Sequence, residues 1–137
     1  MEENDFSNLK VNIKNSVDEH DKYGSWDGLV YNSTTILAVS LSSLAALLPI
    51  QELYVKILAG ISALLITVDK ALNWGERWIY HRQMRHDYLI VLNKIDFYEN
   101  LPSIFTDEER KVYFLEIYSD LYNIRRKEAS MPGVKAR

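Results

Sequence analysis

The sequence predicts an all-α membrane protein, in which a two-helix transmembrane hairpin follows an N-terminal amphipathic helix and precedes two cytoplasmic helices. Three observations predict this class. Residues 29–48 contain no charged side chain, and residues 53–72 form a second apolar run of equal length. Most charged residues lie outside these two runs. With only three prolines and five glycines in 137 residues, long helices can form almost throughout the chain.

The composition also excludes several classes of protein. A formal net charge of −3 argues against a general nucleic-acid-binding protein, because such a protein needs a strongly basic surface. The absence of cysteine excludes disulfide bonds, thiolate catalysis and cysteine-ligated zinc. The sequence has no glycine-rich phosphate loop, no nucleophile elbow and no His-Glu-x-x-His motif. We therefore expect neither an enzyme nor a bound cofactor.

The first predicted part of the chain, residues 1–28, is a cytoplasmic amphipathic helix followed by a loop. Over residues 5–20 the apolar side chains recur every three or four positions, at Phe6, Leu9, Ile13 and Val17. The next segment, HDKYGSWDG, contains two glycines that interrupt this pattern. The sequence therefore predicts that the N-terminal helix ends before the hairpin begins.

The second part, residues 29–72, is the predicted transmembrane hairpin. Its first run, residues 29–48, corresponds to about 30 Å of helix, close to the hydrocarbon thickness of a bilayer, and Pro49 ends it. The second run, residues 53–72, has a shorter uncharged centre between Lys56 and Asp69. Only the sequence PIQE joins the two runs, which predicts a tight helix–helix connection.

Aromatic and basic residues predict how the hairpin is oriented. Tryptophan and tyrosine prefer the headgroup level, and they gather near the ends of the runs at Trp26, Tyr31, Tyr54, Trp74, Trp78 and Tyr80. Basic residues flank the outer ends of the hairpin at Lys10, Lys14, Lys22, Lys70, Arg77, Arg82 and Arg85, against Lys56 alone near its tip. The positive-inside rule therefore predicts that both termini are cytoplasmic. A buried hairpin in a soluble helical bundle is the alternative, which the short uncharged centre of the second run keeps open.

The third part, residues 73–137, is predicted to form two cytoplasmic helices. The first continues directly from the second span and ends at Leu101-Pro102-Ser103, because a residue before proline avoids the α region. Thr106 and Glu109 have the spacing of a capping box and predict the start of the next helix. That helix is apolar around much of its circumference, so we expect it to pack against its neighbours. The tail SMPGVKAR is expected to fray.

The segment WGERWIYHRQMRHDYLIVLNKIDFYEN carries a resemblance to a known family. Within it, Arg82, Tyr88 and Val91 or Leu92 follow the rhythm Arg-x-x-x-x-x-Tyr-x-x-Leu. A hairpin of two apolar helices that runs into such a helix resembles the SLATT family, which are small two-transmembrane proteins associated with nucleotide-signalling conflict systems in bacteria. The resemblance covers the chain from about Leu29 to Ile124. It implies a pore-forming effector of the bacterial inner membrane, opened by a phage-triggered nucleotide signal, and it brings no catalytic residues.

Polar residues of the hairpin are candidates for lining a pore. From Asn32 to Ser43, seven of twelve residues carry a hydroxyl or an amide. The pore-lining candidates are Asn32, Thr35, Ser40, Ser43, Lys56 and Asp69, the last two as rings of charge in a symmetric oligomer. Each residue also has a simpler interpretation. Serine and threonine can bond to their own helix, Lys56 can snorkel to the interface, and Asp69 can be an ordinary helix-end acid.

Small residues are candidates for close helix packing in lipid, where backbones approach only if the side chains between them are short. These residues are Ala38, Ser42 and Ala45 on the first span and Ala59, Gly60, Ala63 and Thr67 on the second.

A set of basic residues outside the hairpin could bind an anionic regulator: Arg77, Arg82, Arg85, Arg125, Arg126 and Lys127. The alternative is that they follow the positive-inside bias and contact anionic lipid. His81 and His86 lie five residues apart, about 140° around a helix, so one chain cannot use both to hold one metal ion. No metal site is expected.

The expected function follows from topology and resemblance together. Because two spans cannot enclose a water path, conduction requires several copies, and we expect a homo-oligomer in the lipid bilayer. Its other expected partner is a nucleotide signal or the protein that makes it, acting on the cytoplasmic helices. The expected activity is a gated ion flux that depolarises the membrane in antiphage defence. The alternatives are a non-conducting anchor or adaptor for a partner protein, and a soluble helical bundle.

Overall fold

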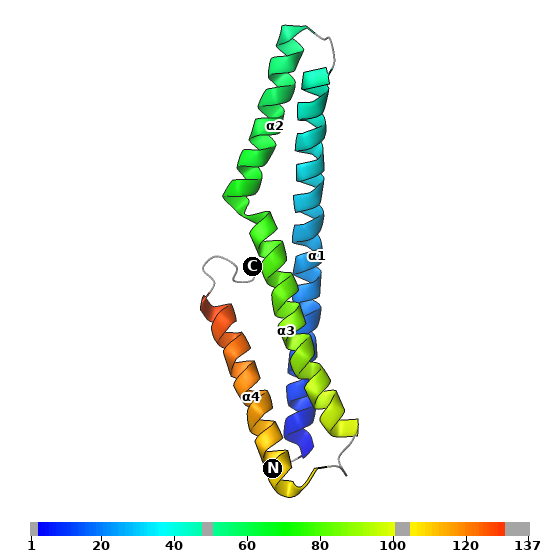
Figure 1. Ribbon diagram of the computed structural model, residues 1–137, viewed down its shortest axis with the longest axis vertical. Helices are drawn as coiled ribbons and strands as arrows, with labels where there is room; N and C mark the ends of the chain where they lie inside the picture. The colour runs from blue at the N-terminus through cyan, green and yellow to red at the C-terminus, as the bar shows by residue number, and fades with distance from the viewer. Residues whose placement is uncertain (1–2, 48–50, 101–104, 131–137) are drawn as a thin grey trace. The chain divides into compact units, whose positions relative to one another are not determined.

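A computed structural model describes residues 3–47, 51–100 and 105–130, and this part of the chain is almost entirely helical, without a strand. The four helices are α1 (Glu3–Leu47), α2 (Glu52–Leu72), α3 (Trp74–Asn100) and α4 (Asp107–Ser130) (Figure 1). The predicted all-α class is confirmed. The expected helix ends at Pro49 and at Pro102, and the tail beyond Ser130, lie outside the described residues.

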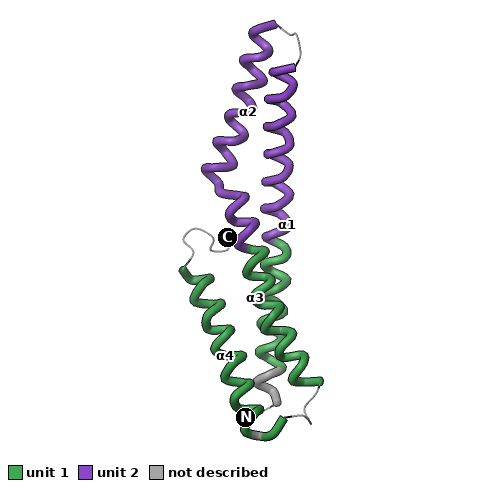
Figure 2. The backbone as a smooth tube through the Cα atoms, viewed as in Figure 1, with its two compact units in different colours: residues 1–22, 81–137 green, residues 23–80 purple. Residues whose placement is uncertain are grey.

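The helices form two compact units (Figure 2). The hairpin unit comprises residues 23–80, and the bundle unit comprises residues 1–22 together with residues 81–137. Helices α1 and α3 each contribute residues to both units. The two units bury different kinds of side chain.

The loop expected within HDKYGSWDG is absent, because α1 runs through this segment without a break. Gly24 and Gly28 are both buried in the helix. A Cβ atom added at Gly28 would lie 2.7 Å from Nε1 of Trp78, which is closer than real Cβ contacts allow. Gly28 therefore allows close packing against an indole ring. The prediction of a loop was wrong because it took both glycines as helix breakers.

The continuous helix expected from the second span into residues 73–100 is also not observed. Asn73 interrupts it with φ 51° and ψ 37°, the left-handed conformation, and is the only described non-glycine residue with a positive φ. Its N–H donates to the carbonyl of Asp69 at 2.8 Å, which closes α2. Asparagine adopts this conformation more readily than most residues, so the chain can end one helix and start α3 at the next residue.

The bundle unit has a buried apolar core. Apolar residues at spacings of three or four are buried along all three of its helices: Leu9, Ile13, Val17, Met84, Tyr88, Val91, Ile95, Ile117, Leu121 and Ile124. Ion pairs surround this core. Lys94 contacts Glu116 at 2.5 Å and Asp120 at 2.7 Å, and hydrogen bonds to these carboxylates raise the pKa of its ammonium group. Of the predicted apolar stripe, Leu9, Ile13 and Val17 are confirmed as a packing face, and the side chain of Phe6 is not among those described.

Helix α4 begins with the predicted capping box. The backbone N–H of Thr106 donates to the Glu109 carboxylate at 2.8 Å, and the N–H of Glu109 donates to the Thr106 hydroxyl at 3.3 Å. These two bonds satisfy backbone donors that a helix start otherwise leaves unpaired. The sequence pattern therefore located the start of α4 correctly.

The hairpin unit is arranged the opposite way, with small and polar groups inside and large apolar side chains outside. At its centre Ala38 and Ser62 are buried, and the Ser42 and Ser62 hydroxyl oxygens lie 2.6 Å apart. Large side chains such as Ile36 and Leu64 remain 67% and 64% exposed. A domain surrounded by water does not normally expose so many large apolar residues on adjacent helices.

Among the described helices, only α1 combines the length and the apolar composition of a membrane span, over Ser7–Leu47. Helix α2 has 21 residues but carries Glu52, Lys56, Asp69 and Lys70. Length and composition alone therefore identify one helix capable of crossing a membrane.

Candidate functional site

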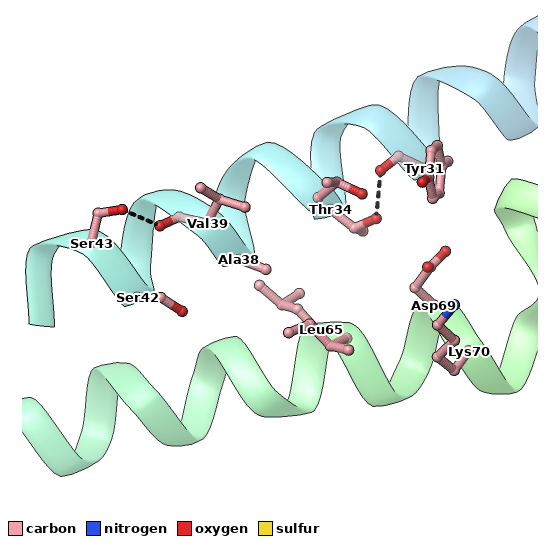
Figure 3. Close-up of a pocket in the computed structure, with 11 residues that line it drawn as sticks. Tyr31, Thr34, Ala38, Val39, Ser42, Ser43, Leu65, Asp69 and Lys70 are labelled. Atoms are coloured by element: carbon pink, nitrogen blue, oxygen red, sulfur yellow. Dashed lines mark hydrogen bonds between the residues drawn. The ribbon is translucent and has the colours of Figure 1, made fainter. Parts of the chain in front are cut away.

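The hairpin unit contains a cavity of about 370 Å³ between α1 and α2 (Figure 3). Helix α1 contributes Tyr31, Thr34, Thr35, Ala38, Val39, Ser42 and Ser43, and α2 contributes Leu65, Ile66, Asp69 and Lys70. Most of the α1 residues carry a hydroxyl group, because they come from a segment that is rich in serine and threonine. The cavity therefore combines hydroxyl groups with aliphatic side chains.

Two of the five hydroxyl groups that α1 contributes to this cavity donate their protons to backbone carbonyls. Thr34 Oγ1 donates to the carbonyl of Val30 at 2.9 Å or of Tyr31 at 3.0 Å. Ser43 Oγ donates to the carbonyl of Val39 at 2.8 Å, as the dashed line in Figure 3 shows. A hydroxyl has one proton and two lone pairs, so these groups have only acceptor capacity left for a molecule in the cavity.

Ser42 belongs to the same group through Ser62. Ser62 Oγ donates to the carbonyl of Ala38 at 2.8 Å, which uses its only proton. In the 2.6 Å contact between the two hydroxyls, Ser42 is therefore the donor and Ser62 the acceptor. Ser62 is 3% exposed and holds α2 against α1 at this point. The oxygen of Ser42 keeps its lone pairs for the cavity.

Asp69 brings the negative charge to the cavity. Figure 3 shows its side chain directed from α2 toward α1, near Tyr31. Its Oδ1 atom is shielded from solvent and has no hydrogen-bond partner within the described residues. A second cavity of about 240 Å³ shares Tyr31, Asp69 and Lys70 and adds Asn73, Gly75, Glu76, Trp78 and Ile79. Asp69 therefore borders both cavities, one turn before the break at Asn73.

The predicted pore-lining residues fall into two groups. Thr35, Ser43 and Asp69 line the larger cavity, whereas Asn32 and Ser40 are exposed and are not part of it. Lys56 is also exposed and forms an ion pair with Glu52 at 2.6 Å, one helical turn away. Tyr31, Thr34 and Ser42 line the cavity and were not among the predicted pore residues. Their spacing of three, four and four, counted through Ala38, was the signal that could have identified this face.

The predicted packing residues are likewise divided. On α1, Ala38 is buried and Ala45 is half-buried, and Ser42 bonds to Ser62. On α2, Ala59, Gly60, Ala63 and Thr67 are exposed, and a Cβ added at Gly60 would meet nothing within 4 Å. Within the hairpin, α2 instead uses Ser62, which the sequence did not single out. A role for the exposed small residues in contacts between copies stays a prediction.

Several of the predicted regulator-binding residues have acidic partners within the chain. Arg77 Nε lies 3.2 Å from Asp27 Oδ2, Arg85 pairs with Asp21 at 2.9 Å, and Lys127 pairs with Asp87 at 2.7 Å. Arg82, Arg125 and Arg126 are exposed. An anionic regulator would have to compete with these carboxylates for Arg77, Arg85 and Lys127.

The histidines form a contact that the sequence did not reveal. His81 is 5% exposed, and its Nδ1 lies 2.9 Å from Nδ1 of His20, which is 61 positions away in the chain. Nε2 of His20 faces Oε1 of Glu128 at 3.4 Å, and the Tyr88 hydroxyl donates to Oε2 of Glu128 at 2.9 Å. His86 is exposed. No group of three or more His, Asp or Glu side chains in the described ranges is placed to hold a metal ion.

No family model, curated protein or solved structure matches this chain. The function is therefore inferred from the geometry of the two units.

Proposed function

We propose that the hairpin unit crosses a membrane twice and that several copies assemble into a gated ion pore. The observation that carries this proposal is the inverted polarity of the hairpin unit. Its helices meet through Ala38, Ser42 and Ser62, while large aliphatic side chains face outward. In water each such side chain loses roughly 1.5–3 kcal/mol of burial energy, whereas lipid is a favourable environment for it.

The charges of α2 are compatible with a second span. Glu52 and Lys56 form an ion pair near one end of the helix, and Asp69 and Lys70 lie near the other. The residues between them, 57–68, are uncharged and correspond to about 18 Å of helix. A short apolar centre is accommodated when flanking lysines reach toward the interface and the bilayer thins locally.

The cavity supports a path for ions. Its hydroxyl oxygens provide polar contacts between the two helices, and the Asp69 carboxylate adds a negative charge near the end of α2. A single hairpin cannot surround such a path, so conduction requires neighbouring copies. The outward-facing Ala59, Gly60 and Ala63 allow another helix to approach α2 closely.

The bundle unit is the proposed site of control. It has its own apolar core, and it shares the helices α1 and α3 with the hairpin unit. The resemblance to SLATT proteins suggests the biological setting: an antiphage effector in the bacterial inner membrane, with both termini in the cytoplasm. In that setting a nucleotide-type signal acting on the bundle unit would shift the population from closed to open pores and depolarise the membrane.

A membrane anchor is the second candidate, and one observation favours it. Helix α4 exposes Val112, Leu115, Tyr118 and Tyr122, at spacings of three or four, on the bundle unit. Such an apolar stripe is a typical protein-binding face. An anchor would hold a partner through this face and conduct no ions.

Ion flux across liposomes that contain the purified protein tests the pore against the anchor. Thr35→Leu/Ser43→Leu replaces two cavity hydroxyls, and Asn32→Leu/Ser40→Leu replaces two polar residues outside the cavity as the matched control. The pore proposal expects flux from the wild type and the control and little from the cavity variant. If the inserted, oligomeric protein conducts no ions even after lysate from infected cells is added to supply the opening signal, the result would support the anchor instead.

A further inference from the structure

We propose that the cavity between α1 and α2 binds a monovalent inorganic cation at Asp69. This inference deepens the pore proposal, on which its consequence for ion selectivity rests, but the binding site itself needs only one folded hairpin unit. It identifies the chemical class of ion that the pore would pass.

The first observation is that three of the five hydroxyl groups on the α1 wall, those of Thr34, Ser42 and Ser43, offer only acceptors to the cavity. Thr34 and Ser43 donate their protons to carbonyls of their own helix, and Ser42 donates to Ser62. These three hydroxyls have no proton left for an anion, so the donors at the cavity are confined to Tyr31, Thr35 and Lys70. A cation needs lone pairs, which all three oxygens retain.

The second observation is the carboxylate of Asp69. Its Oδ1 atom is shielded from solvent and has no hydrogen-bond partner in the part of the chain that the structure describes. A shielded carboxylate oxygen without a donor is unfavourable, and a bound cation would relieve this. Lys70 also borders the cavity, but its side chain is exposed, so its ammonium group can remain in water.

The position of Asp69 adds a further attraction. It belongs to the last turn of α2, which ends at Leu72 before the left-handed Asn73. The carbonyl groups at a helix C-terminus carry partial negative charge and favour cations nearby. The helix end and the carboxylate therefore act in the same direction.

The charge of the site selects a monovalent ion. Asp69 is the only acidic residue among those that line the larger cavity. Calcium and magnesium sites usually combine more than one charged ligand or substrate phosphate with a tight oxygen shell. One carboxylate with neutral hydroxyls balances a single positive charge, and a cavity of about 370 Å³ leaves room for part of the ion's water shell.

Thermal unfolding of the detergent-solubilised full chain tests the site. Melting is compared in potassium chloride and in N-methyl-D-glucamine chloride at equal ionic strength, so that general screening is the same. Binding predicts that potassium raises the melting temperature of the wild type by roughly 3–5 °C when it is present at about ten times its dissociation constant. Asp69→Asn should lose this difference, and Asp69→Glu should keep part of it.

Glu52→Gln is the matched control, because it removes another carboxylate of α2 that lies outside the cavity. It should respond to potassium as the wild type does. Equal melting of the wild type in both salts would overturn the proposal even if Asp69→Asn failed to fold, and so would a potassium effect that survives in Asp69→Asn. A potassium effect without liposome flux would keep the site and reject the pore, so the two proposals fail separately.

Discussion

Two helical glycines of the hairpin unit have opposite surroundings. A Cβ added at Gly28 would lie within 2.8 Å of two atoms of the Trp78 ring, whereas one added at Gly60 would meet nothing within 4 Å. Trp78 is itself stacked on Tyr31, with ring centroids 6.0 Å apart. Glycine inside a helix costs about 1 kcal/mol relative to alanine. At Gly28 the absence of a side chain allows the close approach of Trp78, whereas at Gly60 it allows no contact within the chain.

Alanine substitutions should therefore have opposite effects at the two positions. Gly28→Ala should lower the melting temperature, because the Trp78 ring must shift away from its contact with Tyr31. Gly60→Ala should leave stability unchanged or raise it by up to about 1 kcal/mol. Thermal unfolding in one detergent measures both variants. Equal stabilisation by the two substitutions would show that the Gly28–Trp78 contact has no energetic importance.

Asp27 gives the hairpin unit a pH dependence. The residue is 1% exposed, and removal from water raises the pKa of its carboxyl group, while Arg77 at 3.2 Å opposes the increase. A raised pKa means that the folded protein favours the protonated acid. The contribution of Asp27 to stability is therefore complete below its ordinary pKa of 3.8 and declines as pH rises through the higher folded value.

Comparison with Asp27→Asn isolates this effect, because asparagine cannot ionise. As pH rises from about 3 to about 7, the wild type should lose stability relative to the variant. Melting temperatures of both proteins across this range provide the measurement. A difference that does not change with pH would contradict the assigned shift.

At the scale of elements, the break between α2 and α3 depends on one residue. Asn73 has φ 51°, and its N–H donates to the carbonyl of Asp69. A residue with a Cβ is strained in this conformation by roughly 1–2 kcal/mol, asparagine less than most, and glycine not at all. Asparagine therefore allows the break at little conformational cost.

Asn73→Ala should destabilise the protein by about 1 kcal/mol, because alanine resists the left-handed conformation. Asn73→Gly is the matched control and should be tolerated. Chemical unfolding followed by circular dichroism compares the two. Should Asn73→Ala be as stable as the glycine variant, the break would not depend on the left-handed conformation.

The sequence predicted elements that depend on local patterns. The helical class, the capping box at Thr106 and the stripe at Leu9, Ile13 and Val17 each need only residues within a few turns. It failed where the determining partner is distant in sequence. Gly28 indicated a loop because its contact with Trp78, 50 positions away, is not visible in the local pattern. The contacts of His20 with His81 and of Ser42 with Ser62 span 61 and 20 positions.

At the scale of the whole molecule, one chain combines two opposite patterns of burial. In the bundle unit Met84, Ile95 and Ile117 are fully buried, as in a water-soluble core. In the hairpin unit the inner contacts are made by small and hydroxyl residues, and the aliphatic side chains face outward. The central claim is that this outer surface is covered by lipid. Because individual side chains on both units are equally exposed in the isolated chain, as Ile36 and Leu115 are, only a measurement in the membrane shows which of them lipid covers.

Labelling of single cysteines tests this claim most directly, since the chain has no cysteine of its own. Ile36→Cys and Leu64→Cys place a thiol on the outer surface of the hairpin unit, where the native residues are 67% and 64% exposed. Leu115→Cys on α4 is the control, because Leu115 is also 67% exposed but belongs to the bundle unit. In inside-out membrane vesicles, a membrane-impermeant maleimide should label Leu115→Cys and leave the two hairpin variants unlabelled. Equal labelling of all three variants would show that water covers the hairpin unit, and the membrane account would be wrong.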